Sequence, residues 1–550
     1  MQSRFKYLGM NRWMAIPLIL GLAQAWRSRF FMNYDGVSYL DMGDAYLRGD
    51  WHTAINGYFN PLYAWLQAFS RFVLRPSMYW EYPLAHLVNY GIFVVTVFAF
   101  EYFLQGLIKD RDDVFAIRSI AYSIFLWCSL VLIPVSMIEP DMIICACLYA
   151  ALGILLRRPN TRPVALGAAL AIGYYAKAWM FPLALMILFA AWKLLPRRGV
   201  FIAASTFLLL CAPWIVTLSV SSGHVTIGDT SRLNYAWYVN NVDMGRFWQG
   251  GPPKAGRPIH PARIALDSPR VYEFGGVFPV TYAIWYDNSY WYRGLHLWFS
   301  PRRLAHTYFR NALGLAKFLI CQGGGFLIGW ILCLLLQKDR TLRKDTAPRW
   351  VAWLVGLAAL LFLCMVLVEP RYIASVVATL FLIPFTTLSG RIGKALGGAV
   401  AIGGLAWALA FSSVTTYRGD PTYAFEHTPQ NEAWKLATDM QRLGIQPHEE
   451  LASAGHGGRT PLVFASRLMR ARIIAQLDWS VNFWKLSEPD RQRVLSALAS
   501  TGAKFAVSEE SPPDPSQAVG WQRIGSSSYY AYPLSGLAIS SKANPESAYR

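Results

Sequence analysis

The sequence predicts a polytopic α-helical membrane protein with a soluble α/β domain at its C-terminal end. The chain is 54% hydrophobic and only 15% charged, well below the roughly 25% charge of an ordinary soluble domain. Its first 416 residues contain about eleven apolar segments, and a helix that spans a bilayer needs about 20 mainly apolar residues. After that point, short strands and amphipathic helices replace the long apolar runs.

The first predicted span is an uncleaved helix. Basic residues precede the apolar stretch 14–25, as in a signal peptide, but Trp26 and Arg27 follow it in place of a small-residue cleavage site. The segment 165–195 fits either one long span or two short ones. The predicted spans lie near residues 13–30, 84–105, 114–137, 141–156, 163–178, 180–195, 200–220, 313–336, 350–368, 371–389 and 395–413.

Basic residues occur in alternate connections between these spans, which sets a predicted orientation. Short loops rich in Lys and Arg favour the cytoplasmic side, and such loops occur near 109–113, 157–162, 196–198, 337–349 and 391–394. The N-terminus is then cytoplasmic in the plasma (inner) membrane. The loops 27–83 and 221–311 are exoplasmic. The expected domains are a transmembrane unit, residues 1–416, and an exoplasmic α/β unit, residues 417–550.

The net charge of +19 does not predict a nucleic-acid-binding protein, because the basic residues lie mostly in short loops between apolar segments. That distribution fits membrane topology and contact with anionic lipid headgroups. The seven cysteines all fall within hydrophobic segments and lack the spacing of a zinc site or a disulfide framework. No cofactor is expected, and a role for a divalent metal stays open.

The tail alternates helices and strands in the pattern of a small α/β sandwich with a largely parallel sheet. The glycines of AGHGGRTP, residues 454–461, do not have the spacing of a dinucleotide-binding loop, so a tight turn is expected there. Helices are predicted at 431–443, 461–470 and 488–500, strands at 450–453, 471–477 and 503–508, and a hairpin at 521–533.

The stretch 33–63 places four aspartates directly after the first span: Asp35, Asp41, Asp44 and Asp50. Carboxylates beside a bilayer are costly and are usually retained for chemistry or ion handling. Asp35 is predicted at a helix N-terminus, where it serves either as an N-cap or as a general base. Asp41 and Asp44 share a helix face and are weaker candidates, with too few oxygen ligands between them for a metal site.

The segment after Asn60 predicts an amphipathic helix. Such a helix either lies in the membrane interface or packs on the bundle, and the pattern allows both. Its apolar side carries Leu62, Trp65, Leu66, Phe69, Phe72 and Val73, and its polar side carries Gln67, Ser70 and Arg71.

Several short motifs together resemble the GT-C superfamily of membrane glycosyltransferases. The resemblance covers the layout of roughly residues 10–415. Within this superfamily, the chain is similar to bacterial relatives of protein O-mannosyltransferases and of the aminoarabinose transferase of lipid A. The motifs are Asp35 with Tyr39, GDW at 49–51, PLYAWL at 61–66, MIEPD at 137–141, GYYAK at 173–177 and EPRY at 369–372.

The resemblance implies a transferase that uses a polyprenyl-phosphate-linked sugar on the exoplasmic face, with Asp35 in the position of the catalytic aspartate. The acceptor, a glycan, lipid or protein, is not implied. Many relatives carry an Asp-Glu pair at this point, whereas this chain has Asp35-Gly36, so a role for a second carboxylate does not carry over. The candidate substrate-binding residues are Tyr39, Asp44, Tyr63, Glu139, Asp141, Lys177, Trp291, Tyr292, Arg293, Arg303, Arg371 and Tyr372.

Arginines on the predicted exoplasmic side run against the positive-inside trend. A lipid phosphate would explain them, because the planar guanidinium matches phosphate oxygens; snorkelling toward headgroups is the alternative. Lys177 either joins this phosphate site or pairs with Glu139 or Asp141 across the bundle. The arginines are Arg293, Arg302, Arg303, Arg310 and Arg371.

The second loop is dense in aromatic residues, among them Trp291 and Tyr292, which fit either an interfacial belt or a sugar pocket. Two rival functions stay open. A transporter or flippase for lipid-linked saccharides predicts inverted repeats and charges at mid-membrane, whereas the ionisable residues here lie at the outer ends of the spans. A non-catalytic assembly or receptor subunit would not need the acidic loop and the outer arginines together.

Overall fold

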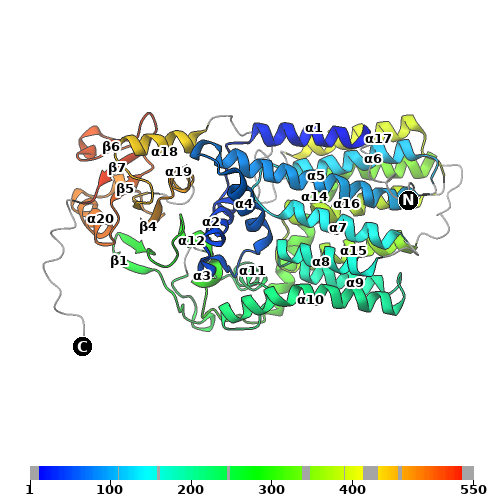
Figure 1. Cartoon of the computed structure of the whole chain (residues 1–550), viewed down its shortest axis with the longest axis horizontal. Helices are drawn as coiled ribbons and strands as arrows, with labels where there is room; N and C mark the ends of the chain where they lie inside the picture. The colour runs from blue at the N-terminus through cyan, green and yellow to red at the C-terminus, as the bar shows by residue number, and fades with distance from the viewer. Residues whose placement is uncertain are drawn as a thin grey trace.

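The computed structural model describes residues 12–109, 111–157, 162–244, 248–336, 347–388, 390–412, 431–455 and 461–535. Figure 1 shows a bundle of long helices and, at one end of it, a region of shorter helices and one sheet. The expectations for parts of the connections 157–162 and 337–349, and for the glycine turn after Gly455, lie outside the described residues.

Each predicted span corresponds to a helix. The segment 165–195 forms two short helices, which meet at Lys177 in an extended backbone conformation. α14 begins well before the predicted span, so Arg302, Arg303 and Arg310 lie on its first turns and not in a loop. The bundle helices are α1 (Arg12–Arg27), α5 (Glu81–Ile108), α6 (Val114–Leu126) with its π-helical extension η2 (Trp127–Leu132), α7 (Asp141–Leu156), α8 (Pro163–Ala176), α9 (Met180–Ala191), α10 (Arg197–Ser222), α14 (Pro301–Leu336), α15 (Ala347–Cys364), α16 (Pro370–Thr387) and α17 (Lys394–Ser412).

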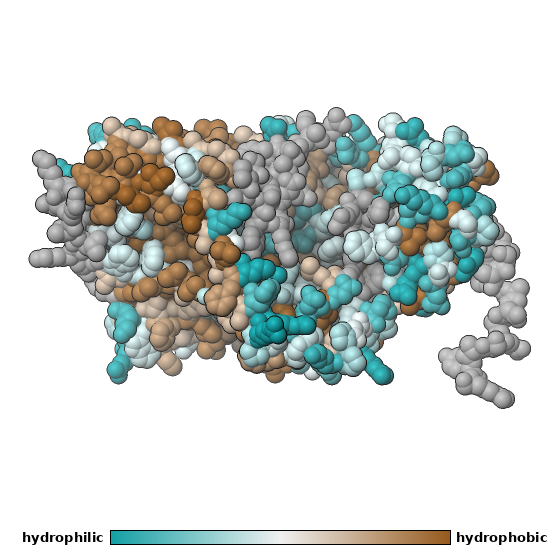
Figure 2. Space-filling model, turned by 180° about the vertical axis from the view of Figure 1, so that it is seen from behind, coloured by the Kyte–Doolittle hydropathy of each residue, from teal (hydrophilic) through white to brown (hydrophobic). Residues whose placement is uncertain are grey.

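Helix burial divides the bundle into a centre and a lipid-facing shell. In the apolar window of α16, 72% of residues are buried, against 28% in α10 and α17. α16 is therefore central, and α10 exposes large apolar side chains such as Phe201 and Leu209. Figure 2 shows hydrophobic surface over the helical end and mainly hydrophilic surface over the opposite end. This distribution, together with seven helices long and apolar enough to cross a bilayer among the described residues, identifies a polytopic membrane architecture.

The first loop folds into α2 (Tyr34–Arg48), α3 (Trp51–Ala54) and α4 (Pro61–Leu74). α2 ends at Gly49, whose φ of 72° is the left-handed conformation that suits glycine at a helix C-terminus. α4 turns its polar side inward: Gln67 and Arg71 are buried, while Phe69 and Phe72 are exposed. Of the two alternatives for this helix, packing on the protein is observed, and a position in the membrane interface stays a prediction. Polar groups pack on the protein and apolar groups point outward.

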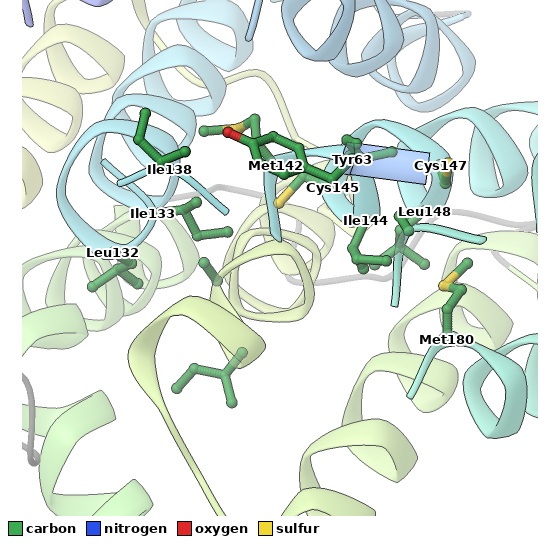
Figure 3. Close-up of a cluster of buried hydrophobic side chains, with 14 of the residues drawn as sticks. Tyr63, Leu132, Ile133, Ile138, Met142, Ile144, Cys145, Cys147, Leu148 and Met180 are labelled. Carbon is green, nitrogen blue, oxygen red and sulfur yellow. The ribbon is translucent and has the colours of Figure 1, made fainter. Parts of the chain in front are cut away.

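The hydrophobic core continues from the bundle into the loops. Figure 3 shows Tyr63 of α4 among apolar side chains that include Met142 and Cys145 of α7, Ile138 of the preceding connection and Met180 of α9. Because these segments share one core, the first loop is packed against the ends of α7 and α9.

The second loop contributes helices and a β-hairpin, and the tail contributes the remaining strands. All of the elements predicted for the described part of the tail are present. The second loop contains α11 (Thr230–Tyr238), β1 (Arg263–Asp267), β2 (Arg270–Glu273), α12 (Ala283–Tyr286) and α13 (Asn288–Trp291). The tail contains α18 (Glu432–Arg442), β3 (Glu450–Ser453), α19 (Pro461–Met469), β4 (Arg472–Leu477), α20 (Glu488–Ser500), β5 (Phe505–Ser508), β6 (Gln522–Arg523) and β7 (Tyr530–Pro533).

One sheet joins the two segments, in the order β1-β2-β4-β3-β5-β7-β6. Its central strands β4, β3 and β5 are parallel, as predicted, and β7 and β6 add the antiparallel hairpin. β2 pairs antiparallel with β4, with Val271 opposite Leu477. The tail sheet is therefore completed by a hairpin of the second loop, which the sequence did not predict because a short edge strand carries a weak hydrophobic pattern.

Candidate active site

Five charged side chains meet where the first loop contacts the end of the bundle: Asp35, Glu139, Asp141, Lys177 and Arg371. We call this group the charged cluster. Its members stand at helix ends and connections that converge at this level: the first turns of α2, α7 and α16, the connection before α7 and the break between α8 and α9. The convergence follows from the alternation of the spans, because these ends all lie on one side of the bundle.

Two ion pairs hold the charged cluster together. Lys177 Nζ donates to both carboxylate oxygens of Asp141 at 2.8 Å. Arg371 donates to Glu139, and its Nη1 lies 3.6 Å from Asp35 Oδ2. The side chains of Glu139 and Asp141 are 2% and 1% exposed, against 33% for Asp35. Asp35 is thus the accessible carboxylate, and the two buried ones anchor the cations.

The electrostatics of the charged cluster bring the protonation of Glu139 close to its midpoint near neutral pH. Burial raises the pKa of Glu139 to about 7, with Asp141 also raising it, against the opposing effect of Arg371. Protonating Glu139 leaves Asp35 and Asp141 balanced by Lys177 and Arg371. Arg371 also lies at a helix N-terminus, where the backbone dipole disfavours a cation and favours an anion beside it.

Tyrosines line the charged cluster. Lys177 Nζ lies 4.1 Å from the ring centroid of Tyr372, within cation–π range. Tyr39 and Tyr63 pack edge to face with ring centroids 4.9 Å apart. Burial raises the pKa of Tyr39 well above its ordinary value, and the carboxylates Asp35, Asp141 and Glu139 raise it further. Tyr39 is therefore a neutral phenol that keeps its proton.

A cavity of about 140 Å³ opens beside the charged cluster. Lys177 and Tyr372 line one part of it, and Thr230 and Asn234 of α11 add polar groups. Apolar side chains at the end of α15 and in the connection after it, residues 362–367, form the opposite wall. A cation and hydroxyls at one end of an apolar wall suit a ligand with an anionic head and a hydrocarbon chain.

Asn33 occupies the N-cap position of α2, with Asp35 in the first turn. The Asn33 Oδ1 accepts a hydrogen bond from the backbone N–H of Ile138 at 3.0 Å. This contact ties the start of α2 to the connection that carries Glu139. The N-cap alternative for Asp35 is therefore wrong.

Asp44, a predicted substrate-binding residue, belongs to a different group of charges. It pairs with Arg71 at 2.8 Å, Arg467 at 2.6 Å and Arg470 at 3.0 Å. These contacts turn its carboxylate toward the tail.

The aromatic and basic candidates of the second loop also lie apart from the charged cluster. Trp291 and Tyr292 are each 1% exposed and donate to the backbone carbonyls of Ala283 and Asp243. Arg293 donates to the carbonyl of Ser221 at 2.8 Å. Burial of these rings leaves no free face for a sugar.

Arg303, on the first turn of α14, donates to the backbone carbonyl of Asn240 at 2.6 Å. This contact joins α14 to the second loop. The described geometry therefore brings together Asp35, Tyr39, Tyr63, Glu139, Asp141, Lys177, Arg371 and Tyr372 from the predicted set.

Two features of the site were missed by sequence reasoning. Tyr58 is half-buried, and its pKa is raised by burial and by nearby Tyr372 and Asp35. Its position two residues before the Asn60-Pro61 break is the local feature of the sequence that could have marked it as a site residue. The second feature is Tyr34, whose ring stacks on Trp285 with centroids 5.4 Å apart.

The ring of Tyr34 also contacts Phe464 of α19 at 5.4 Å. A residue of the first loop, one of the second loop and one of the tail thus form an aromatic cluster, and its central member, Tyr34, precedes Asp35 in α2. No local pattern predicts this contact, because it depends on tertiary packing.

Two solved structures share this architecture along nearly the whole chain. One is ArnT from Cupriavidus metallidurans in the apo state, with a TM-score of 0.52 and 11% identity, covering 95% of this chain and 98% of that chain. The other is ArnT from the same organism bound to undecaprenyl phosphate, with a TM-score of 0.51 and 11% identity, covering 97% and 99%. The chain shares the fold of ArnT. No family model and no curated protein matches the sequence.

The ArnT-like fold confirms the predicted resemblance at the level of architecture. It includes the bundle and also the sheet region, because the matched structures are covered almost completely. In this ArnT-like fold the charged cluster lies at the junction between the bundle and the loops. A ligand held there has its polar part among the loops and any hydrocarbon part against the bundle.

Proposed function

We propose that the protein transfers a sugar from a polyprenyl-phosphate-linked donor to an acceptor on the exoplasmic face of the membrane. The observation that carries this proposal is the accessible carboxylate of Asp35, whose Oδ2 lies 3.6 Å from Arg371 Nη1 beside an apolar-walled cavity. The fold shared with ArnT, including ArnT bound to undecaprenyl phosphate, supports a membrane glycosyltransferase of this type.

The donor phosphate pairs with Arg371 and Lys177 in this proposal. Both are partly exposed and are held in place by ion pairs with buried carboxylates. Lys177 lines the cavity itself. The positive end of the α16 backbone dipole at its first turn adds to the attraction for a phosphate. The polyprenyl chain lies along the apolar wall formed by residues 362–367. These groups bind and orient the donor, and the cation pair stabilises the departing polyprenyl phosphate.

Asp35 acts as the general base. An acceptor hydroxyl or amine loses its proton to the Asp35 carboxylate as it attacks the anomeric carbon. The bond from that carbon to the phosphate oxygen breaks, and its electron pair stays on the polyprenyl phosphate. One bond forms and one breaks, and Asp35 carries the released proton until it passes to solvent through its exposed side.

The topology belongs to the same proposal. Both large loops and the tail gather at one end of the bundle (Figure 1), as one exoplasmic face requires. The N-terminus is then cytoplasmic, residues 1–416 form the transmembrane unit and residues 417–550 the exoplasmic unit, in the plasma membrane. Membrane lipids surround the bundle, and the lipid-linked sugar donor enters the proposed step as a substrate.

The test compares sugar transfer by the purified full-length protein and by Asp35→Asn, with polyprenyl-phosphate sugars as donors. General-base catalysis contributes roughly 10²–10⁴-fold, so transfer should fall by that factor. The matched control is Asp50→Asn in the same loop, because Asp50 accepts a bond from the Thr53 N–H at the start of α3 and lies outside the charged cluster. Transfer by Asp35→Asn at the wild-type rate would refute the catalytic assignment.

The rival function is transport of lipid-linked saccharides across the membrane. It predicts movement of the intact donor between leaflets of protein-containing vesicles without any change of its glycosidic bond. Vesicles that flip the donor but never release free polyprenyl phosphate would favour the transporter.

A further inference from the structure

A second cavity lies on the lipid-facing side of the bundle and shares no lining residue with the cavity beside the charged cluster. Its volume is about 490 Å³. The last turns of α1 and the first turns of α5 form its walls. Residues 74–77, at and just after the end of α4, close the end that faces the loops. We call it the α1–α5 groove.

The walls of the α1–α5 groove are apolar and face outward. Leu22 and Leu87 line it and are 50% and 55% exposed. Trp26 and Trp80 flank it near the loops and are also exposed, as is usual for tryptophan at a membrane interface. Apolar surface on the outside of a membrane bundle is covered by hydrocarbon chains, so the groove has the chemistry of a site for an acyl chain.

Two arginines stand at the loop end of the groove. Arg29 is held in place, because its Nη1 donates to the Trp26 carbonyl at 2.8 Å and its guanidinium lies 4.4 Å from the Trp26 ring centroid. Arg75 follows α4 in the left-handed conformation, with φ of 43°. Within the described residues, the Arg75 guanidinium makes no hydrogen bond or ion pair.

No Asp or Glu of the described residues lines the groove. Glu81, at the start of α5, is turned away and pairs with Arg467 and Arg470. The rim therefore presents two uncompensated positive charges above an apolar channel. The complementary ligand has an anionic head attached to hydrocarbon chains.

We propose that the α1–α5 groove binds an anionic glycerophospholipid of the membrane, with its phosphate at Arg29 and Arg75 and an acyl chain between α1 and α5. The groove also touches the first loop: buried His86 lines it, and His86 Nε2 hydrogen-bonds to the Phe31 carbonyl at 2.9 Å. Phe31 lies in the segment that enters α2. A lipid in the groove thus packs against the support of the helix that carries Asp35.

The test measures phospholipid retained by the detergent-purified full-length protein, using native mass spectrometry after addition of phosphatidylglycerol or phosphatidylcholine. Arg29→Ala/Arg75→Ala removes both charge-assisted contacts to the phosphate, so it should bind phosphatidylglycerol at least about a hundredfold more weakly. The control is Arg302→Ala, which removes an exposed arginine from the first turn of α14, away from the groove. It should retain phosphatidylglycerol as the wild type does.

A second variant tests the acyl-chain part of the site. Leu22→Trp fills the groove from an exposed position and leaves both arginines intact, so it should also release phosphatidylglycerol. Leu209→Trp on α10, where Leu209 is 73% exposed, is its control. The melting temperatures of all four variants are measured, and lipid retention is compared only among variants that remain as stable as the wild type.

Three outcomes would overturn the proposal. The first is unchanged retention of phosphatidylglycerol in both groove variants. The second is equal binding of phosphatidylcholine and phosphatidylglycerol by the wild type, which describes a non-specific annulus. The third is displacement of phosphatidylglycerol by stoichiometric polyprenyl phosphate, which describes a second donor site. None of these readouts depends on sugar transfer.

Discussion

Arg467 of α19 and Asp41 of α2 are 426 residues apart in the chain, yet Arg467 Nη1 lies 2.7 Å from Asp41 Oδ1 and both side chains are buried. They belong to a group of three arginines and three carboxylates, which we call the clamp. The clamp connects the tail to the first loop and to the start of α5. Its members are Asp41, Asp44, Arg71, Glu81, Arg467 and Arg470.

The clamp predicts a large cost for Arg467→Ala. This change leaves the buried carboxylates of Asp41 and Glu81 without their principal partner, and breaking a buried ion pair from one side costs about 3–5 kcal/mol. We expect a clear loss of thermal stability in the purified protein. The control is Arg472→Ala, whose pair with Glu450 is about one-third exposed and so contributes at most about 1 kcal/mol. Equal losses in the two variants would contradict the clamp.

Acid should weaken the clamp through Asp44. Burial raises the pKa of Asp44, but Arg467, Arg71 and Arg470 outweigh burial and hold it well below its ordinary value. A carboxyl with a lowered folded-state pKa contributes stability that is present above its unfolded pKa, about 4, and is lost as pH falls below it.

Thermal unfolding measured from pH 6 to pH 3 should therefore show a steeper decline for the wild type than for Asp44→Asn. Asp41 is a poorer probe, because burial raises its pKa despite Arg467. A decline of the same slope in Asp44→Asn would show that other carboxyls dominate acid unfolding.

Local composition determined the parts of the fold that the sequence predicted. Each span is a continuous apolar run, and the alternation of basic connections placed Glu139, Lys177 and Arg371 at helix ends on one face. The charged cluster follows from that placement. Its tyrosines came from motif resemblance, since nothing in the pattern around Tyr39 distinguishes a site residue from a core residue.

Contacts between distant segments account for the parts that were missed. Arg467 and Arg470 lie at helical spacing and resemble ordinary surface charges of the tail, and their partners are hundreds of residues away. Trp291 and Tyr292 show the opposite error, because aromatic density does not distinguish a buried ring from one that is open to a sugar. The hairpin of β1 and β2 needs β4 to complete its pairing, so its own sequence carries little signal.

Binding of the proposed donor should weaken as pH rises through about 7. Burial raises the pKa of Glu139 to about 7, so Glu139 is mostly protonated below this pH and ionised above it. Ionised Glu139 competes with the donor phosphate for Arg371, while neutral Glu139 releases that cation. The charged groups that face Glu139 are Asp35, Asp141, Lys177 and Arg371.

The measurement is the affinity for a polyprenyl-phosphate sugar, whose phosphodiester does not titrate near neutrality, at pH 6 and pH 8. Wild-type affinity should be higher at pH 6, and Glu139→Gln should bind equally at both values. A pH dependence that persists in Glu139→Gln would assign the titration to another group.

Arg371 should contribute more to donor affinity than any other arginine predicted on this side of the membrane. A charge-assisted contact to phosphate contributes about 1.5–3 kcal/mol, so Arg371→Gln should weaken donor binding by roughly 10- to 150-fold. Removing the guanidinium also leaves Glu139 buried without its cation. The double variant Arg371→Gln/Glu139→Gln separates the two effects, because it removes the guanidinium without leaving the buried carboxylate unpaired, and it should still bind weakly. Arg303→Gln is the matched control, since Arg303 donates to the Asn240 carbonyl away from the charged cluster, and an equal loss in Arg303→Gln would remove Arg371 from the proposed site.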